Sequence, residues 1–310
     1  MNEKQILALG FFDGVHLGHA ALLRECRSLA EKENCRAGVV TFGSHPEELI
    51  RGTAPGLINT LSDRERLLKE TFQMDNVIVL PFDRKLRTMH YMDFFRMLLG
   101  TYHAAGFVCG EDFRFGHRGE GNAKKLAEAC ADAGLPCTVV PQQKLNGQAV
   151  SSTLIRSYME TGYMSKAVAC LGHPHILTGK VVRGHQLGRT IGIPTANLML
   201  PKELVVPKFG VYVCIAQVEG KRYPAVTNIG TRPTVAGIGI TVEPWLLDYS
   251  GDLYGREITL EFYQFLRPEQ KFSTLEALRD EIRRNAEEAR KILKELSHPD
   301  TCVRDENVVE

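Results

Sequence analysis

Two histidines in a glycine-rich run are the residues whose types and spacing most directly suggest chemistry. They lie in Gly10-Phe11-Phe12-Asp13-Gly14-Val15-His16-Leu17-Gly18-His19, directly after an apolar stretch. Between a strand and a helix, such a run offers backbone N–H groups and the helix dipole to an anion. Both imidazoles can then face one triphosphate, although two structural histidines at a helix start are the alternative. The candidate phosphate contacts are His16, His19, Gly10, Asp13, Gly14 and, for close backbone approach, Gly18.

A second candidate for chemistry is the string Gly188-Arg189-Thr190-Ile191-Gly192-Ile193-Pro194-Thr195-Ala196-Asn197. In an extended segment, alternation places Thr195 and Asn197 on one face. Their side-chain oxygens are hard ligands of the type that Mg²⁺ accepts together with phosphates and water. The string therefore predicts a Mg²⁺ site, and a polar turn that enters a strand is the alternative.

The elements around the histidines predict an α/β domain. Short apolar runs alternate with amphipathic stretches, a pattern typical of parallel strands joined by helices in a doubly wound, Rossmann-like sheet. The expected strands are 5–9, 37–42, 76–81, 106–109 and 136–140. The expected helices are 20–32, 62–72, 91–99, 122–132, 152–160 and 165–171. We expect Ser62 to be the N-cap of the second helix, because Glu65 follows three residues later.

The character of the sequence changes at Gly172-His173-Pro174, where we place a domain boundary. Beyond it, strand-like segments with frequent Gly and Pro predict a small antiparallel β-barrel. The expected strands are 211–218, 225–229, 239–242 and 257–265. Residues 274–296 have helical apolar spacing and predict a C-terminal helix packed on the barrel. The predicted domains are 1–172 and 173–298, with a polar tail over 299–310.

Composition narrows the class of protein. The 310 residues carry 38 Lys and Arg against 37 Asp and Glu, so no overall field favours a nucleic-acid or membrane partner. The eight cysteines form no Cys-x-x-Cys pair, which favours buried reduced thiols over disulfides or metal sites. The N-terminus has no signal-like apolar segment, and we therefore expect a cytoplasmic location.

The histidine run resembles the His-x-Gly-His signature of the nucleotidyltransferase superfamily. The flanking residues are similar to the prokaryotic bifunctional riboflavin kinase/FAD synthetase family, and the resemblance extends from about residue 6 to 295. The segment 110–116 resembles the family's flavin-side loop, and the segment 150–156 resembles the one that supplies hydroxyls and a guanidinium to nucleotide phosphates. The resemblance implies flavin contacts at Asp112, Phe113 and Arg114, and phosphate contacts at Ser151, Ser152, Thr153 and Arg156. Taken alone, the serines read as a helix N-cap and the arginine as a solvated residue.

The second half resembles riboflavin kinases. Pro194-Thr195-Ala196-Asn197 is similar to the motif that holds Mg-ATP in that family, and the segments 228–234 and 252–255 also match. The resemblance implies that Gly179 and Lys180 belong to the phosphate-covering loop, and that Gly188 is a further phosphate-binding residue. It also implies that Glu243 is the base that accepts the proton of the ribityl hydroxyl. Arg267 resembles a family arginine near the flavin or phosphate, and a structural salt bridge is the alternative.

Three positions depart from the family pattern. Ser44 stands where the family usually has proline, and we interpret this as a looser loop. Pro244-Trp245 follows Glu243 where the family usually has an aliphatic residue or Thr and then His, which favours a weaker kinase. At the domain junction, we expect His173 and His175 to be exposed imidazoles in a turn rather than a metal site.

The resemblance implies an enzyme that phosphorylates riboflavin to FMN and adenylylates FMN to FAD, with ATP as co-substrate and Mg²⁺ as cofactor. An FMN phosphate oxygen would attack the α-phosphorus of ATP, and pyrophosphate would leave. Protonated or N–H-donating His16 and His19, together with Arg156 and Mg²⁺, would stabilise the transition state. The alternatives are a chain with one active domain, most readily the adenylyltransferase, a flavin-binding regulator, and an adenylyltransferase for another acceptor.

Overall fold

The computed structural model describes residues 4–45, 49, 52–184, 188, 192–234 and 237–297, and it forms two compact units. The first unit comprises Met1–Arg156, Ala169–His173 and Glu203–Val205, and the second comprises Ser157–Val168, Pro174–Lys202 and Val206–Glu310. The boundary near residue 172 stays a prediction, and the predicted tail lies outside the described residues. Within the described part of the chain, no helix is both long and apolar enough to span a membrane.

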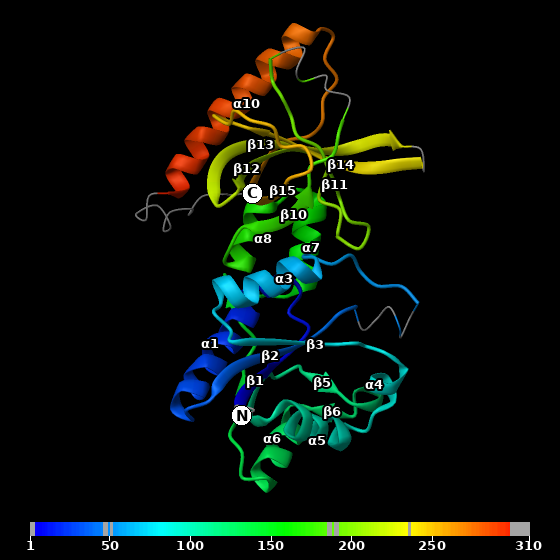
Figure 1. The fold of residues 1–310 in the computed structure, drawn as a ribbon, viewed down its shortest axis with the longest axis vertical. Coiled ribbons are helices and arrows are strands. Elements are labelled where there is room, and N and C mark those ends of the chain that lie inside the picture. The colour runs from blue at the N-terminus through cyan, green and yellow to red at the C-terminus, as the bar shows by residue number, and fades with distance from the viewer. Residues whose placement is uncertain are drawn as a thin grey trace. The chain divides into compact units, whose positions relative to one another are not determined.

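The first unit is built on a five-stranded sheet in the order β3-β2-β1-β4-β7, and its strand pairs are parallel (Figure 1). The strands are β1 (Gln5–Leu9), β2 (Arg36–Phe42), β3 (Asn76–Leu80), β4 (Ala104–Gly110) and β7 (Cys137–Val140). The central strand β1 is buried along its whole length, because helices cover both faces of a doubly wound sheet. The predicted α/β fold is confirmed.

The described helices of the first unit are α1 (Leu17–Lys32), α3 (Leu61–Arg66), α4 (Arg84–Thr88), α5 (Tyr91–Tyr102), α6 (Ala123–Asp132), the start of α7 (Ser152–Thr161) and the end of α8 (Met164–Leu171). Among these helices, α1, α5 and α6 pack against the sheet. On one face, α5 and α6 bury Phe94, Leu98 and Leu126 against the sheet residues Leu7 and Leu9. The predicted Ser62 cap is wrong. Thr60 caps α3 instead, because its side chain accepts the N–H of Asp63 and so the helix starts one residue earlier.

Short elements connect these helices and strands. They are the 3₁₀ turns Asp13–Val15 and His117–Gly119, the π-helical turn Leu67–Thr71, and the strands β5 (Arg114–Phe115), β6 (Gly121–Asn122), β8 (Lys144–Leu145) and β9 (Gln148–Ala149). β5 pairs with β6, and β8 pairs with β9. The strands β1 and β4 therefore lead directly into irregular segments, where the predicted phosphate and flavin residues lie.

The second unit contains a six-stranded antiparallel sheet in the order β10-β15-β12-β13-β14-β11. Its strands are β10 (His175–Lys180), β11 (Leu198–Met199), β12 (Gly210–Val218), β13 (Lys221–Thr234), β14 (Gly237–Leu246) and β15 (Glu257–Arg267). Gly179 of β10 packs against the Leu198 side chain of β11, so the two edge strands approach each other and the sheet nearly closes. This confirms the predicted small barrel.

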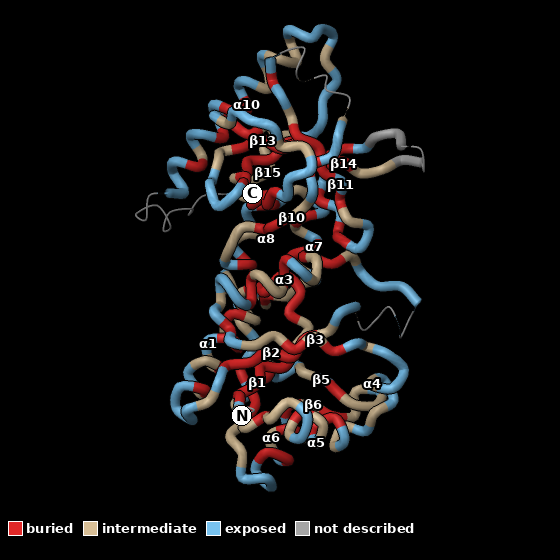
Figure 2. Tube along the Cα trace, viewed as in Figure 1, coloured by how far each residue is buried: buried red, intermediate tan, exposed pale blue. Residues whose placement is uncertain are grey.

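The C-terminal helix α10 (Leu275–Leu296) packs on the barrel, as predicted. Ala286, Ala289 and Leu293 face a core that contains Val213 and Val226, whereas much of the helix surface is exposed (Figure 2). Small alanines at two of these positions let the helix approach the sheet closely. Thr274 caps the helix by accepting the N–H of Ala277.

The described cysteines carry free thiols. Burial raises the pKa of Cys26 and of Cys109 to about 12, so these thiols are unreactive. The prediction of exposed junction imidazoles is wrong. His175 is 3% exposed, and its ring lies against Phe262, because position 175 begins a strand of the barrel. His173 is half-buried, with Nε2 3.1 Å from the carbonyl oxygen of Gly14.

Candidate active sites

A cavity of about 440 Å³ opens at the carboxyl ends of β1 and β4 in the first unit. Five separate segments form its wall, namely the β1–α1 turn with the start of α1, the end of β2, the loop after β4, the end of β7 with the loop after it, and the start of α7. The predicted residues that line it are Gly10, His16, Gly18, His19, Asp112, Phe113, Arg114, Ser151, Ser152, Thr153 and Arg156. The fold therefore brings together residues that lie up to 146 positions apart in sequence, Gly10 and Arg156.

The two histidines form a stacked pair at the start of α1. Their ring centroids are 3.7 Å apart and their planes differ by 15°. His16 is the N-cap, and its Nδ1 accepts the backbone N–H of His19 at 3.4 Å. Because Nδ1 acts as acceptor, a neutral His16 carries its proton on Nε2 and can donate it to a phosphate oxygen.

Both imidazoles are held in the neutral form. Burial lowers the pKa of His16 to about 4, and burial lowers the pKa of His19, with smaller effects from His16 and Arg64. The Nδ1 atom of His19 is buried and has no hydrogen-bond partner among the described residues. Of the two predicted alternatives, protonated or N–H-donating, this environment favours the neutral N–H donor.

Asp13 and Gly14 do not line the cavity but lie directly behind it. The buried Asp13 carboxylate accepts the backbone N–H of Ile58 at 2.8 Å and lies 3.5 Å from Nη2 of Arg156. Its own carbonyl oxygen accepts the Ser152 hydroxyl at 2.9 Å. Asp13 thus joins the histidine run to the start of α7, and it orients the Arg156 guanidinium rather than a phosphate. Gly14 has φ +80, which favours glycine.

Arg64 is a residue that the sequence analysis missed. Its side chain is fully buried, and Nη1 donates to the carbonyl oxygens of Phe11 and Phe42 at 2.8 and 3.2 Å and to Thr41 Oγ1 at 3.1 Å. The guanidinium lies 4.4 Å from the centre of the Phe11 ring. No sequence signal marks it, because an arginine in a short polar helix is normally solvated. In the structure it fixes two walls of the cavity.

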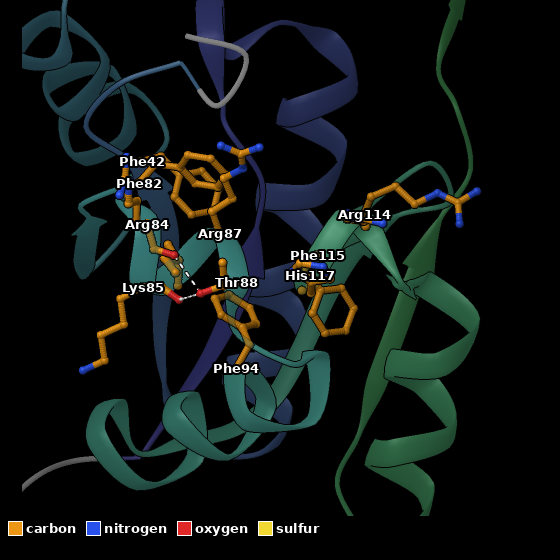
Figure 3. Close-up of a pocket in the computed structure, with 14 residues that line it drawn as sticks. Phe42, Phe82, Arg84, Lys85, Arg87, Thr88, Phe94, Arg114, Phe115 and His117 are labelled. Atoms are coloured by element: carbon orange, nitrogen blue, oxygen red, sulfur yellow. Dashed lines mark hydrogen bonds between the residues drawn. The ribbon is translucent and has the colours of Figure 1, made fainter. Parts of the chain in front are cut away.

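A second, larger pocket of about 960 Å³ adjoins this cavity and shares Phe42 and Arg114 with it (Figure 3). Its lining combines aromatic and basic side chains, namely Phe42, Phe82, Phe94, Phe115, Arg84, Lys85, Arg87, Arg114, His117 and Arg118. Among the described residues no acidic side chain lines it. Figure 3 shows the Arg114 guanidinium pointing away from the aromatic rings. The pocket suits a flat, apolar and electron-poor or anionic ring system.

The second unit holds a cavity of about 310 Å³ on the face of the barrel that α10 covers. Four of the predicted residues line it, namely Gly188, Thr195, Glu243 and Arg267. Glu243 lies on β14 opposite Asn228 of β13, and Oε1 of Glu243 accepts the Thr241 hydroxyl at 3.4 Å. Strand register therefore brings the Glu243 carboxylate to the wall of a cavity that has both polar and apolar lining residues.

Arg267 is tied into the barrel while it lines this cavity. Its Nε donates to Asn285 at 3.0 Å and lies 3.2 Å from the Glu281 carboxylate, which is the predicted salt-bridge alternative. Glu269, which the sequence analysis missed, lines the same cavity and accepts the Asn228 amide N–H at 3.3 Å. Two carboxylates and one guanidinium thus surround the polar end of the cavity.

Another cavity of about 310 Å³ lies on the other side of Thr195, which lines both. Its wall includes the predicted segment around Asp252 and Tyr254. Asn197 is 8% exposed, and a Cβ at Gly184 would come within 2.5 Å of its amide, so the backbone approaches this side chain closely. Gly179 and Lys180 lie on β10 and line neither cavity.

Comparison with known proteins gives matches over both units. The FAD synthetase family model matches residues 1–154, and the riboflavin kinase family model matches residues 171–293. A protein of Escherichia coli (strain K12), named bifunctional riboflavin kinase/FMN adenylyltransferase, is 38% identical over 93% of this chain and 92% of its own. A protein of Bacillus subtilis (strain 168) with the same name is 33% identical over 92% of each.

A solved structure shows the same fold. The crystal structure titled macrolide-efflux protein from Streptococcus pneumoniae has a TM-score of 0.84 and 29% identity, and the match covers 94% of this chain and 95% of that one. The efflux activity in that title belongs to that protein. Each of these three matches therefore covers more than nine-tenths of this chain and of the protein that it is compared with.

Proposed function

The chain belongs to the family of bifunctional riboflavin kinase/FMN adenylyltransferases, and from this premise we propose how its residues perform the two reactions. It phosphorylates riboflavin to FMN and adenylylates FMN to FAD, with ATP as co-substrate. The observation that carries our assignment of residues is that each unit places a polar cavity beside a largely aromatic or apolar one, with shared residues in the common wall.

In the first unit, we assign the nucleotide to the cavity around His16 and His19. The neutral imidazole of His16 donates its Nε2–H, and Arg156, held by Asp13, adds a fixed positive charge beside the phosphates. These groups face the charge that develops when an FMN phosphate oxygen attacks the α-phosphorus and pyrophosphate leaves. No protein nucleophile is required, since positioning and charge stabilisation account for phosphoryl-group transfer.

The isoalloxazine ring of FMN fits the aromatic pocket of Figure 3. Phe42, Phe94 and Phe115 offer apolar surface to a flat ring, and Arg114 lies in the wall that this pocket shares with the nucleotide cavity. A flavin bound there extends its ribityl phosphate toward the histidines. Asp112 and Phe113 line the nucleotide cavity and would contact the ribityl chain, whose hydroxyls can donate to the Asp112 carboxylate.

In the second unit, we assign riboflavin to the cavity under α10 and ATP to the cavity beside Tyr254. Glu243 is then the base that takes the proton of the ribityl 5′-hydroxyl as the γ-phosphate is transferred. Thr195 lines both cavities, so it lies where the hydroxyl and the γ-phosphate must meet. The paired Arg267 is placed to orient the flavin end.

We propose that a magnesium ion binds at Thr195, which lines both cavities, and that Asn197, which is 8% exposed and lines neither cavity, would be a second oxygen donor two residues further on. Among the described residues no cluster of three or more His, Cys, Asp or Glu side chains can hold a metal, so a protein cage of charged ligands is not available there. Mg²⁺ commonly takes one or two protein oxygens and completes its shell with phosphates and water, and Thr195 and Asn197 supply such oxygens. The bound ion would neutralise charge on the transferred phosphate.

We place the enzyme in the cytoplasm. Its described cysteines are free thiols, several of them deeply buried, which suits a reducing compartment. ATP is also a cytoplasmic substrate, so the chemistry and the thiol state point to the same location.

The test incubates the purified chain with ATP and Mg²⁺, once with riboflavin and once with FMN, and separates the flavins by chromatography. We expect FMN and then FAD from riboflavin, and FAD from FMN. His16→Ala should reduce FAD formation about 100- to 1000-fold, the usual effect of losing one transition-state hydrogen-bond donor, and leave FMN formation intact. Glu243→Gln should do the reverse. Equal loss of both activities in either variant would contradict the assignment, and flavin binding without turnover would indicate a regulator.

A further inference from the structure

Trp245 lies in the same cavity as the proposed base. Residues two apart on a strand point to the same face, and both Glu243 and Trp245 of β14 line the cavity under α10. Their partners on β13 are Asn228 and Val226, which line it as well. A polar pair and an apolar pair therefore lie next to each other on two hydrogen-bonded strands.

The indole is the largest apolar group in the cavity wall, and it packs against a buried core. Trp245 is half-buried and packs against the core that includes Val211, Val226 and Leu247. Across the cavity, α10 contributes Leu278 and Ile282. A ring held on one side by close-packed core atoms loses little conformational freedom when a ligand binds to its other side.

We propose that Trp245 is the aromatic wall against which the isoalloxazine ring of riboflavin packs, and that it sets the affinity of the kinase site for flavin. This inference rests on the proposed kinase role of the second unit. Trp245 is a positioning and specificity residue, because it contacts the ring system, whereas Glu243, two residues earlier, serves the hydroxyl that reacts. The geometry thus separates flavin affinity from proton transfer on one strand.

The expected effects follow from this separation. Trp245→Leu keeps an apolar side chain but removes the aromatic face, which is worth about a 2- to 13-fold change in affinity. We expect the KM for riboflavin to rise by that factor, with kcat within about twofold of the wild-type value. Trp245→His, which restores the residue that the family usually has, keeps a smaller ring and should give an intermediate KM.

A spectroscopic measurement distinguishes contact with the flavin from support of the fold. Trp245 is the only tryptophan in the chain, and indole quenches flavin emission when the two rings are in contact. Riboflavin bound without ATP and excited in the visible should therefore emit more strongly in Trp245→Leu than in the wild type. Tyr263→Leu is the matched control, since Tyr263 packs against the same core but does not line the cavity.

The two proposals fail in different ways. A wild-type protein that makes no FMN from riboflavin would refute the kinase assignment, and the emission titration would still report on ring contact. A wild-type protein that makes FMN, combined with unchanged KM and unchanged bound-flavin emission in Trp245→Leu, would refute the role of Trp245 alone. Equal effects of Trp245→Leu and Tyr263→Leu on KM would also refute it, because they would indicate core packing.

Discussion

Replacing Arg64 tests whether a buried charge outside the cavity controls adenylyl transfer. In Arg64→Met, three hydrogen bonds of Nη1 are lost, those to Phe11, Thr41 and Phe42. Hydrogen bonds from a charged group contribute about 1.5–3 kcal/mol each. The substitution also removes a buried ion, whose desolvation costs several kcal/mol, and two buried nitrogens, Nε and Nη2, that have no partner among the described residues.

These opposing contributions nearly cancel in the free energy of unfolding, and we expect Arg64→Met to change it by less than about 2 kcal/mol. Activity has no such compensation. Phe11 and Phe42 line the nucleotide cavity, and a displacement of about 1 Å at an active site can cost about 100-fold in rate. We therefore expect FAD formation from FMN to fall at least tenfold.

The assay compares FAD formation from FMN with FMN formation from riboflavin in the same preparation. The second activity is an internal control, because it belongs to the other unit. Arg64→Lys retains three N–H donors near the same acceptors and should recover part of the lost rate. A folded Arg64→Met variant with an unchanged kcat for FAD formation would refute the reasoning, and so would an equal loss of both activities.

Three other predictions concern charge. Burial lowers the pKa of His16 in the folded protein to about 4, so between pH 6.5 and 4 the unfolded chain binds a proton at this residue that the folded chain does not. As the pH falls through that window, the free energy of unfolding should decrease by up to about 3 kcal/mol. Denaturant unfolding of the wild type and of His16→Gln measures this decrease, which should be smaller in the variant. With the histidines in the proposed role of neutral donors, kcat for FAD formation should stay level from pH 7 to 8.5, and a decline of about tenfold per pH unit would indicate a protonated imidazole. Asp13→Asn leaves Arg156 without its buried partner and should cost the first unit about 3 kcal/mol and most FAD formation, while an unchanged unfolding midpoint would contradict the ion pair.

Sequence patterns predicted the elements well because their signals are local. The strand expected over 5–9 matches β1, and the helix expected over 274–296 differs from α10 by one residue at its start. The spacing of apolar residues and the turn-forming residues are patterns of about ten positions, so they can be recognised without knowledge of the fold. The N-cap of α3 was predicted wrongly because a local signal did not decide it. Thr60 and Ser62 are both residue types that cap helices, and the path of the preceding chain decides between them.

The sequence predicted several residues that line the cavities, but it missed a buried residue that supports a cavity wall. Resemblance identified His16, His19 and Glu243, and the fold brings each of them to a cavity. Arg64 could not be predicted, because its role depends on which backbone carbonyl oxygens accept its N–H groups. Every residue type has a backbone carbonyl oxygen, so the sequence does not mark these acceptors. Asp13 was assigned to the phosphates because it lies in the histidine run, although its carboxylate points to the N–H of Ile58 behind the cavity.

Each of the two units has a pair of neighbouring cavities with lining residues in common. In the first, Phe42 and Arg114 belong both to the histidine cavity and to the aromatic pocket, and in the second, Thr195 belongs to both cavities. Each reaction joins a phosphate of one substrate to an oxygen of the other, so the reacting atoms must meet where the two cavities share a wall. Specificity for flavin and for nucleotide can then be set by side chains on opposite sides of that wall, while residues in the wall govern the rate.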